Sequence, residues 1–486
     1  MTRRWNPGGY VHRRISPWVR GILFWRRLTP PTLFVWSFVL LIAIGTAGLL
    51  LIPGLQIGPK LSFIESLFTM TSAACVTGMM VVDTSSHFTP AGQAWILLFI
   101  QLGGLGLITL TSLLIGALGK QLSLRSEMLS MVQVRRTDRT EVWQLALRVA
   151  KFSLIVEGIG ALLLFGLWLP DMPAPEAAWH AVFHAINAYC NAGLSTFSTS
   201  LSEMSSSPLT LIVVSMLVII GGLGYYTFEE LVRWWRTAQR RRQGLRIDIR
   251  STHRLSSHSW AVLVTSAVLL LAGWILFAVF EWHGTLGSMS PGDKLANAWF
   301  LSATPRSAGF ANVDYSMVGN DTAALTMMLM LVGGSPGSTA GGLKTTTIAV
   351  LVALGLSRMR GKRFVGIKSR AIPAETIERT IGIILLAMLV LVTSFFLLCA
   401  IEGSGLTAET SRAQFLPLAF ETVSAFSTVG LSMNLTPELA GSSKLILVGL
   451  MFIGRVGLLS FFTAIALRRS QPPAYLRPAQ EDVIVG

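Results

Sequence analysis

The sequence predicts an all-α polytopic membrane protein in which four membrane–pore-loop–membrane repeats surround one central pore, with about eight transmembrane helices. Three observations lead to this prediction. The 486 residues are 52% hydrophobic and only 13% charged, whereas about a quarter of the residues in a soluble domain are charged. Apolar runs of spanning length, about 20 residues, recur from end to end. Short polar, glycine-containing stretches such as "NAYCNAGL" at 187–194 separate these runs.

The net charge of +15 is unevenly distributed along the chain, and this distribution predicts the topology. The basic clusters lie at residues 3–27, 120–151, 233–254 and 358–379, with a final Arg pair at 468–469. By the positive-inside rule these segments are cytoplasmic. We therefore expect a multi-pass protein of the cell inner (plasma) membrane with both termini in the cytoplasm. A basic run can also bind nucleic acid, but the run at 233–254 continues directly from a span, so we expect no nucleic-acid partner.

Four related motifs recur at nearly constant spacing, and each has glycine in third place and a large apolar residue in fourth. Their glycines are 115, 116 and 121 residues apart, and an aromatic residue stands ten residues before each one. The glycines are Gly78, Gly193, Gly309 and Gly430, and the aromatic residues are Phe68, Phe183, Trp299 and Phe420. The stretch between aromatic and glycine suits a short helix but is too short to span a membrane.

The repeated unit is therefore an apolar span, a half-helix, a glycine loop and a second span. Non-helical backbone at membrane depth is tolerated where it lines a water-filled path. Four such loops around one axis would present a ring of carbonyl oxygens to a small cation, with the negative ends of the half-helices pointing at it. Close helix packing by small residues is the alternative, and the fourfold register favours the pore.

These repeats predict the domain boundaries. We expect a basic cytoplasmic N-terminal segment at 1–31, repeats at 32–119, 146–236, 258–358 and 375–469, and a cytoplasmic tail at 470–486. The second span of each repeat carries a further glycine motif, "GGLG" at 103–106 and 221–224, "GGSPG" at 333–337 and "GRVG" at 454–457.

The third repeat is predicted to have a broken second helix. Its segment "LVGGSPGSTAGGLKTTTIAV" at 331–350 contains glycines, Pro336 and polar residues that a membrane helix does not tolerate. A phosphate-binding loop is the alternative, but Leu343 separates Gly342 from Lys344, and no soluble strand precedes the segment. A packing kink without a gating role also remains open.

Two arginines lie at membrane depth. Arg455 in the last span should face water or a partner, because a mid-span arginine costs about 2.5–3.5 kcal/mol; a snorkelling side chain is the alternative. Arg306 precedes Gly309 by three residues and is expected to brace the third loop.

The three cysteines do not form a disulfide framework, and the grouping of Cys190 with His180 and His184 favours packing over a metal site. The chain carries no HExxH, GxSxG or paired intramembrane carboxylates, so we expect no enzyme activity.

Together these residues resemble the Trk/Ktr/HKT superfamily of potassium transporters, over about residues 32–469. The resemblance is carried by "TSAACVTGMMVVDT", "QLGGLG", "NAGLSTF", "ATPRSAGFANVD", "GGSPGSTAGGLKTTT" and "ETVSAFSTVGLSMN". Only about 32 residues precede the first apolar run, so eight spans fit, and the chain resembles KtrB more than TrkH.

The resemblance implies a selectivity filter and a gate. The filter residues would be Val76, Thr77, Gly78, Asn191, Ala192, Gly193, Ser307, Ala308, Gly309, Thr428, Val429 and Gly430. The gate residues would be Gly333, Gly334, Ser335, Gly337, Ser338, Thr339, Gly341, Gly342, Lys344 and Arg455. Some sodium-favouring plant members carry serine at the first filter glycine, so Gly78 supports potassium without excluding sodium.

The function that the resemblance implies is passive, channel-like potassium uptake. It also implies a homodimer and a cytoplasmic nucleotide-binding regulator of the RCK type, similar to KtrA or TrkA. No covalent cofactor is expected, nucleotide would act only through the partner, and membrane lipid is a further partner. The alternatives are a sodium- or proton-coupled potassium symporter and the channel-like subunit of an ATP-driven potassium pump.

Overall fold

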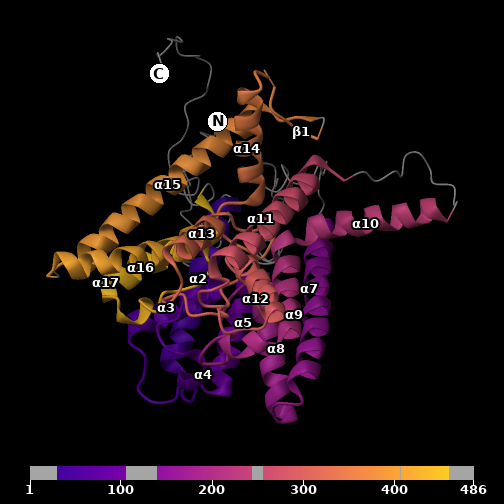
Figure 1. Ribbon diagram of the computed structural model, residues 1–486. Helices are drawn as coiled ribbons and strands as arrows, with labels where there is room; N and C mark the ends of the chain where they lie inside the picture. The colour runs from indigo at the N-terminus through magenta and orange to yellow at the C-terminus, as the bar shows by residue number, and fades with distance from the viewer. Residues whose placement is uncertain are drawn as a thin grey trace, which may run out of the picture.

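The computed structural model describes residues 30–105, 139–243, 255–362, 364–368, 370–405 and 407–458. The regular secondary structure of these residues is helical apart from one small hairpin, in which β1 (Gly366–Ile367) pairs antiparallel with β2 (Arg370–Ala371). Figure 1 shows this arrangement, which confirms the all-α prediction. Residues 1–29, the tail at 470–486 and the basic residues at 120–138 and 244–254 lie outside the described residues.

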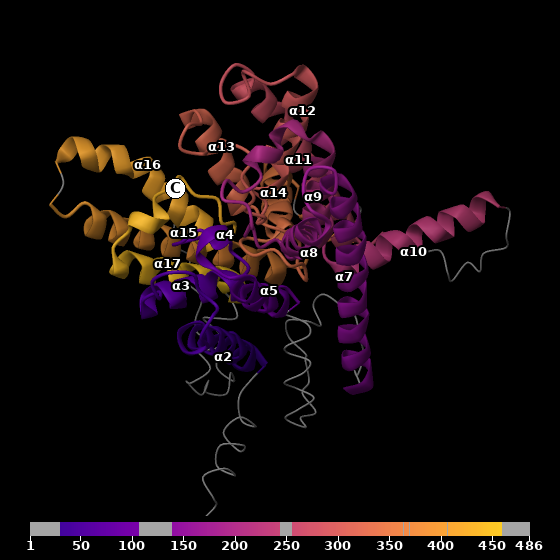
Figure 2. The same ribbon diagram turned by 90° about the horizontal axis from the view of Figure 1, so that it is seen from below.

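One order of elements recurs four times: a long helix, a shorter helix that ends at a glycine loop, and a second helix. The first two occurrences are α2 (Pro30–Leu51), α3 (Phe63–Ala74), α4 (Thr84–His87) and α5 (Pro90–Gly104), then α7 (Arg139–Trp168), α8 (Ala174–Cys190), η1 (Ser202–Ser206), α9 (Pro208–Leu223) and α10 (Tyr225–Arg242). The last two are α11 (Ser257–Glu281), α12 (Pro291–Ala303), α13 (Asn320–Leu331) and α14 (Thr345–Met359), then α15 (Ala374–Glu402), α16 (Ala408–Ser427), η3 (Thr436–Glu438) and α17 (Gly441–Val456). Figure 2 shows the four groups around a common centre in chain order.

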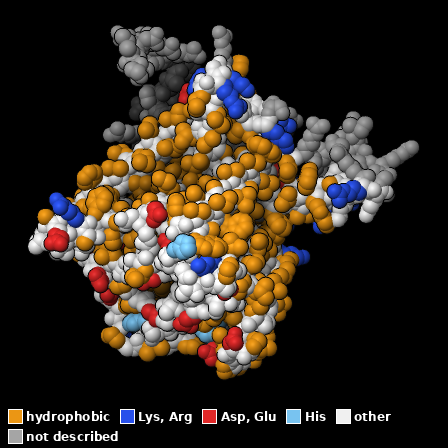
Figure 3. Space-filling view, viewed as in Figure 1, with side chains coloured by type: hydrophobic (Ala, Val, Ile, Leu, Met, Phe, Trp, Pro, Cys, Tyr) orange, Lys and Arg blue, Asp and Glu red, His pale blue; other side chains and the backbone are white. Residues whose placement is uncertain are grey.

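Within the described residues four single helices are long and apolar enough to cross a membrane, and the bent pair α9–α10 would make a fifth span if counted as one. The four single helices are Phe34–Leu51, Gln144–Trp168, Ser257–Glu281 and Ala374–Glu402, the first helices of the four groups. Most of their apolar surface faces outward, as in α15, where Phe396 is 68% exposed. In Figure 3 hydrophobic side chains cover most of the visible face, and many acidic side chains gather at the end opposite α14. This distribution is that of a protein with several membrane spans.

The second helices of the four groups are short, and that of the second group is bent where the sequence predicts a continuous span. In the described residues they are only 12–16 residues long, about 18–24 Å at 1.5 Å per residue. In the second group the chain turns by 98° between α9 and α10, and α10 extends away from the other helices (Figures 1 and 2). The turn occurs at Gly224, whose φ of 77° ends the helix.

Local sequence signals explain where the shorter helices begin. Ser62 accepts a hydrogen bond from the Glu65 amide, and Glu65 accepts one from the Ser62 amide, which forms a capping box. These hydrogen bonds from Ser62 hold the pKa of the Glu65 carboxyl below its usual range. The Ser290 and Thr407 side chains, at the N-caps of α12 and α16, each accept one hydrogen bond from a backbone amide in the first turn.

The buried apolar side chains join neighbouring groups into a closed ring. One cluster packs α2 and α3 against α16 and α17 and includes Tyr189 of α8. A second joins α7–α9 to Phe300 and Phe310 of the third group, and a third joins α11–α13 to Phe420 and Leu431 of the fourth. Each group therefore shares a core with the next one, and the glycine loops lie where the four groups meet.

Candidate functional site

The four glycine loops (residues 76–78, 191–193, 307–309 and 428–430) share one backbone conformation. The third residue of each loop is glycine with positive φ, from 71° at Gly193 to 94° at Gly430. The first residue also has positive φ although none is glycine, and the values are 56° at Val76, 61° at Asn191, 70° at Ser307 and 49° at Thr428. A left-handed conformation costs such residues about 1–2 kcal/mol, and strain of this kind is typical of functional sites. The alternation in the sign of φ turns successive peptide groups toward the same side of the chain.

The loops touch one another in a closed cycle. A Cβ atom on Gly78 would lie 2.2 Å from the Ala192 carbonyl oxygen, and one on Gly193 would lie 2.6 Å from the Ala308 carbonyl oxygen. The cycle continues with Gly309 and the Val429 carbonyl oxygen at 2.1 Å, and closes with Gly430 and the Thr77 carbonyl oxygen at 2.1 Å. Each glycine therefore leaves room for the central carbonyl of the next loop. The structure brings all twelve predicted filter residues together in this ring.

The short helices end directly at these loops. At the ends of α3, α8 and α16 the amide of the first loop residue donates to the carbonyl oxygen three residues earlier. The amide of the second loop residue donates to the carbonyl oxygen five residues earlier, as from Thr77 to Ser72 at 2.8 Å. The third loop differs, because both Ala308 and Gly309 donate to the Thr304 oxygen. In all four cases the negative end of a helix dipole meets the loop.

In the first, second and fourth groups the second glycine motif also has a structural reason. A Cβ atom on Gly103, Gly221 or Gly454 would lie 1.9–2.0 Å from a carbonyl oxygen in the last turn of the preceding short helix. These oxygens belong to Ala74, Tyr189 and Phe426, each four residues before its loop glycine. The second helices can therefore pack against the short helices only where they carry glycine.

The glycine-rich loop of the third group (residues 332–344) lies against one side of the ring. The Gly341 amide donates to the Ser307 hydroxyl at 3.0 Å, and a Cβ atom on Gly341 would lie 2.0 Å from the Thr428 hydroxyl oxygen. Helix α13 ends at Leu331 and α14 begins at Thr345, on either side of the segment where the sequence predicts a break.

The glycine-rich loop is held by carbonyl groups that the neighbouring helices leave free. The Ser335 amide donates to the Gly222 oxygen at 2.9 Å, and the Ser335 hydroxyl also bonds the Leu223 oxygen. The Thr339 hydroxyl donates to the Tyr189 oxygen at 3.1 Å. Helix ends carry carbonyls without intrahelical partners, so the break of α9 at Gly224 creates the sites that hold this loop.

Arg455 of α17 joins the glycine-rich loop to the first group. Its guanidinium donates to the Thr339 oxygen and, at 2.5 and 3.4 Å, to the Gly103 and Gly104 oxygens at the end of α5. Arg455 is only 8% exposed, so it does not snorkel to the surface. The ammonium group of Lys344 donates to the Ala340 oxygen at 2.7 Å within the loop itself.

Arg306 points away from the ring. Its guanidinium donates to the Ser266 hydroxyl of α11 at 2.9 Å, which is a contact that holds the third loop against its long helix. Within the described residues no three His, Cys, Asp or Glu side chains are grouped as metal ligands, and all three cysteines are free.

The sequence reasoning missed a buried carboxylate beside the ring. Glu157 of α7 is 4% exposed, and Gln101 of α5 donates to both of its oxygens, at 3.0 and 3.1 Å. The Cys190 thiol donates to the Gln101 amide oxygen at 3.4 Å, immediately before the second glycine loop. The signal was present, because Glu157 is the one acidic residue between Leu147 and Leu169, and an ionisable residue within a span is a functional candidate.

Comparisons with known proteins agree with this architecture. Residues 31–473 match the TrkH family, described as cation transport protein. The chain is 34% identical over 458 residues to the Ktr system potassium uptake protein B of Vibrio alginolyticus, covering 94% of this chain and 95% of the relative. It is 35% identical over 447 residues to the protein of the same name from Bacillus subtilis, covering 92% and 95%.

A third relative and a solved structure extend the comparison. The potassium/sodium uptake protein NtpJ of Enterococcus hirae is 33% identical over 462 residues, covering 95% of this chain and 98% of the relative. The crystal structure of the potassium transporter TrkH from Vibrio parahaemolyticus superposes with a TM-score of 0.65 at 18% identity, covering 97% of this chain and 88% of that one. This chain therefore belongs to the TrkH cation transport protein family, whose members are multi-pass membrane transporters and not enzymes.

Proposed function

We propose that this protein takes up potassium across the cell membrane through one pore, formed by four membrane–pore-loop–membrane repeats at residues 32–119, 146–236, 258–358 and 375–469. The single observation that carries this proposal is the closed cycle of four glycine loops, in which each glycine adjoins the next loop's central carbonyl. Helices α3, α8, α12 and α16 are then pore helices. The spans would number about eight, counting one broken or shortened second span per repeat.

The ion would be bound by backbone oxygens of the twelve filter residues. A ring of carbonyl groups, which carry no formal charge, can replace the hydration shell of a cation. Such a ring suits a path that must also release the ion. Gly78 favours potassium, and sodium is the second cargo to test, since one relative is named a potassium/sodium uptake protein.

The gate would be the glycine-rich loop together with Arg455. The loop contacts Ser307 and Thr428 of the filter, so it obstructs the path on the side where these contacts lie. Arg455 would stabilise the closed arrangement by bonding both Thr339 and the end of α5. Opening requires these bonds to be exchanged for others, so an effector must bind the open arrangement better.

The remaining partners follow from the family and from charge. Two relatives are named as components of a Ktr system, which supports a homodimer controlled by a cytoplasmic nucleotide-binding regulator. The basic residues of α10 supply a surface for such a partner. Both termini would be cytoplasmic, with nucleotide acting through the regulator and no covalent cofactor on this chain.

Glu157 favours a second candidate, a sodium- or proton-coupled potassium symporter. Coupling of this kind requires an ionisable group near the ion path, and Glu157 is joined to Cys190, at the end of α8, through Gln101. A buried carboxylate at membrane depth is a common coupling site.

Flux through purified protein in liposomes separates these functions. Potassium and sodium are offered separately without nucleotide, and then potassium is offered with an imposed sodium or pH gradient. Passive uptake predicts potassium flux that follows its own electrochemical gradient, and unchanged direction when the other gradients are imposed. Uphill potassium accumulation driven by either gradient, and lost in Glu157→Gln, would establish the symporter instead.

A further inference from the structure

The pore-helix residue nine positions before each filter glycine divides the four repeats into two kinds. In the second and fourth repeats this residue is His184 or Glu421, and both side chains are fully buried. In the first and third repeats it is Thr69 or Phe300. A buried ionisable side chain needs hydrogen-bonding partners, and both of these find them in the segment that leaves the filter.

In the fourth repeat the Glu421 carboxylate gathers three donors from that segment. The Ser432 hydroxyl and the Met433 amide donate to Oε1, the latter at 3.2 Å, and the Thr436 hydroxyl donates to Oε2 at 2.7 Å. Ser432, two residues after Gly430, also accepts from the Asn434 amide at 3.0 Å. The segment that leaves the fourth loop is thus held against its own pore helix.

The second repeat uses the same construction with different chemistry. His184 Nε2 lies 2.9 Å from the Ser195 hydroxyl oxygen, and Ser195 is two residues after Gly193. Ser195 also accepts from the Phe197 amide at 2.9 Å, the counterpart of the Ser432 and Asn434 pair. His184 Nδ1 lies 2.8 Å from the His180 carbonyl oxygen, so Nδ1 carries the proton and the neutral ring accepts from Ser195 through Nε2.

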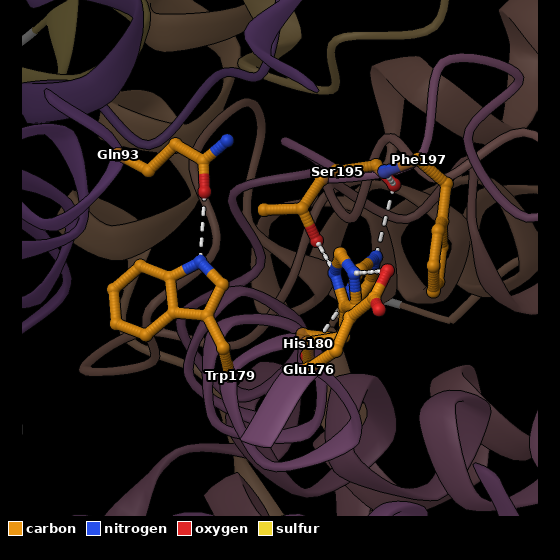
Figure 4. Close-up of polar contacts among 8 residues, drawn as sticks. Gln93, Glu176, Trp179, His180, Ser195 and Phe197 are labelled. Carbon is orange, nitrogen blue, oxygen red and sulfur yellow. Dashed lines mark hydrogen bonds and ion pairs between the residues drawn. The ribbon is translucent and has the colours of Figure 1, made fainter. Parts of the chain in front are cut away.

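Neighbouring side chains reinforce the second repeat. The rings of His184 and Phe197 stack with centroids 4.8 Å apart. Figure 4 shows Ser195 and Phe197 of the exit segment above His180 of the pore helix, with Trp179 bonded to Gln93 of the first repeat. The other acceptor near the Ser195 hydroxyl, the Ser200 carbonyl oxygen, is farther away at 3.5 Å.

Within the described residues the first and third repeats make no such contact at this offset. The third repeat instead ties its exit segment to the pore helix through the Thr304 hydroxyl, which donates to the Phe310 oxygen at 2.6 Å. The Thr69 hydroxyl donates to the Glu65 oxygen of its own helix at 2.8 Å, and Phe300 is apolar. Because the loops touch in the order first, second, third, fourth and back to first, the two connected loops face each other across the ring.

We propose that His184 and Glu421 are selectivity-determining positioning residues, which hold two opposite filter loops through Ser195 and Ser432 and so set the width of the carbonyl ring along one diagonal. The proposal rests on the proposed function of potassium uptake. Hydrogen bonds to a charged or buried partner are strong and directional, and a filter keeps its geometry only where supporting contacts lock it. The amides of Gly78 and Gly430 also donate to pore-helix hydroxyls, those of Ser72 and Ser424, at 3.0 Å. These contacts hold the glycine itself and not the segment that leaves the filter.

The test measures the potassium-to-sodium flux ratio of single variants in liposomes. Ser195→Ala and Ser432→Ala each remove one hydroxyl and are expected to lower the ratio about fivefold, the factor that one lost hydrogen bond corresponds to. The double variant should lower it further. Thr69→Val is the control: it removes a hydroxyl at the first-repeat position that corresponds to His184 and Glu421, and it should leave the ratio unchanged.

Two further variants separate position from charge and from packing. Glu421→Gln keeps an amide oxygen for Ser432 and Met433 and an amide nitrogen for the Thr436 hydroxyl, so it should retain most of the ratio. A loss as large as that of Glu421→Ala would show that the negative charge matters instead of the positioning, and would overturn the proposal. His184→Phe keeps the ring against Phe197 without the acceptor, and should behave like Ser195→Ala.

Thermal unfolding in detergent with potassium or sodium supplies a second readout. The wild type should be stabilised more by potassium than by sodium, and the two serine variants should lose this difference. The proposal would be rejected if both serine variants kept the wild-type flux ratio and the wild-type difference in stabilisation by the two ions, while Gly430→Ala changed the flux ratio. The contacts would then have only a structural role. If potassium stabilised the wild-type protein but no potassium flux were measured, the transport function would be refuted. The ion-dependent stabilisation of the variants would still decide the role of His184 and Glu421.

Discussion

Gly430 leaves room for the carbonyl oxygen of Thr77, which would lie 2.1 Å from a Cβ atom at that position. This contact joins the last glycine loop to the first and closes the ring. Gly430 also has a φ of 94°, which other residues adopt only with strain. Both space and backbone conformation therefore require glycine here, and the same two requirements meet at Gly78.

Replacing a ring glycine should change the preference for potassium over sodium. We expect Gly78→Ser and Gly430→Ala to lower the potassium-to-sodium flux ratio about tenfold, which corresponds to about 1.4 kcal/mol of differential ion stabilisation. Gly193 and Gly309 should be similarly sensitive, because both also have positive φ and adjoin a carbonyl oxygen. Gly382→Ala in α15 is the control, since a Cβ atom there has open space around it. An unaltered ratio in all four ring variants would reject the filter assignment.

The glycine motif of α17 offers a matched pair for stability. A Cβ atom on Gly454 would lie 1.9 Å from the Phe426 carbonyl oxygen, whereas one on Gly449 in the same helix would meet nothing within 4 Å. Gly454→Ala should therefore destabilise the protein by about 1–3 kcal/mol, the usual cost of overpacking. Thermal unfolding in detergent measures this, and Gly449→Ala should unfold at the wild-type temperature. Equal unfolding temperatures for the two variants would contradict the close approach of α17 to α16.

The sequence predicted the glycine loops well because their constraint is local and repeated. A left-handed glycine at a fixed distance from an aromatic leaves a visible pattern, and three of the four aromatics, Phe68, Phe183 and Phe420, are fully buried. Trp299 is the exception: it is partly exposed and donates to the Ser215 hydroxyl of α9 at 2.9 Å.

Other features depend on contacts between distant segments, which one sequence does not reveal. The bend after Leu223 was not predicted, because its reason lies in Ser335, more than a hundred residues later, which bonds the freed carbonyls of α9. The positioning contacts of His184 and Glu421 were also missed, since a histidine and a glutamate at the same offset do not look alike in sequence. Only their shared attachment to a serine two residues after the filter glycine shows the relation.

Arg455 should hold the gate closed through its geometry and not only through its charge. Arg455→Gln should raise flux in the absence of the regulator about tenfold or more, because hydrogen bonds to a charged group contribute about 1.5–3 kcal/mol. Arg455→Lys keeps the charge but cannot reach Thr339 and the end of α5 at once, so its flux should also rise. The measurement is potassium flux in liposomes without nucleotide. If the lysine variant behaved like the wild type, electrostatic repulsion of the ion would explain the effect better than the two-sided contact.

Deleting the glycine-rich loop from about Gly334 to Thr345 should raise basal flux while the potassium-to-sodium ratio stays largely unchanged. A milder variant, Thr339→Val, removes the hydroxyl that donates to the Tyr189 oxygen and should raise flux by a smaller factor. The control is Ser357→Ala in α14, which lies beyond the loop. Reduced flux in folded protein, for either variant, would make the loop a structural element and not a gate.

The basic surface of α10 should bind the cytoplasmic regulator. Replacing Arg240, Arg241 and Arg242 with Gln should weaken copurification of the regulator and reduce nucleotide-dependent flux, while intrinsic flux and ion preference persist. The reason is charge: α10 continues the basic run well beyond what topology requires, and in both ribbon views it extends away from the other helices.

Membrane lipid is the competing partner for this helix, because Trp234 and Trp235 are 42% and 55% exposed beside the arginines, a composition typical of a helix at the membrane interface. Binding to vesicles with and without anionic lipid, measured alongside regulator copurification, separates the two. Trp234→Ser with Trp235→Ser is the matched variant, which should weaken vesicle binding and leave the regulator bound. If the arginine variant lost only its affinity for anionic vesicles and bound the regulator normally at several salt concentrations, α10 would be a lipid contact, and the regulator would have to dock elsewhere on the cytoplasmic face.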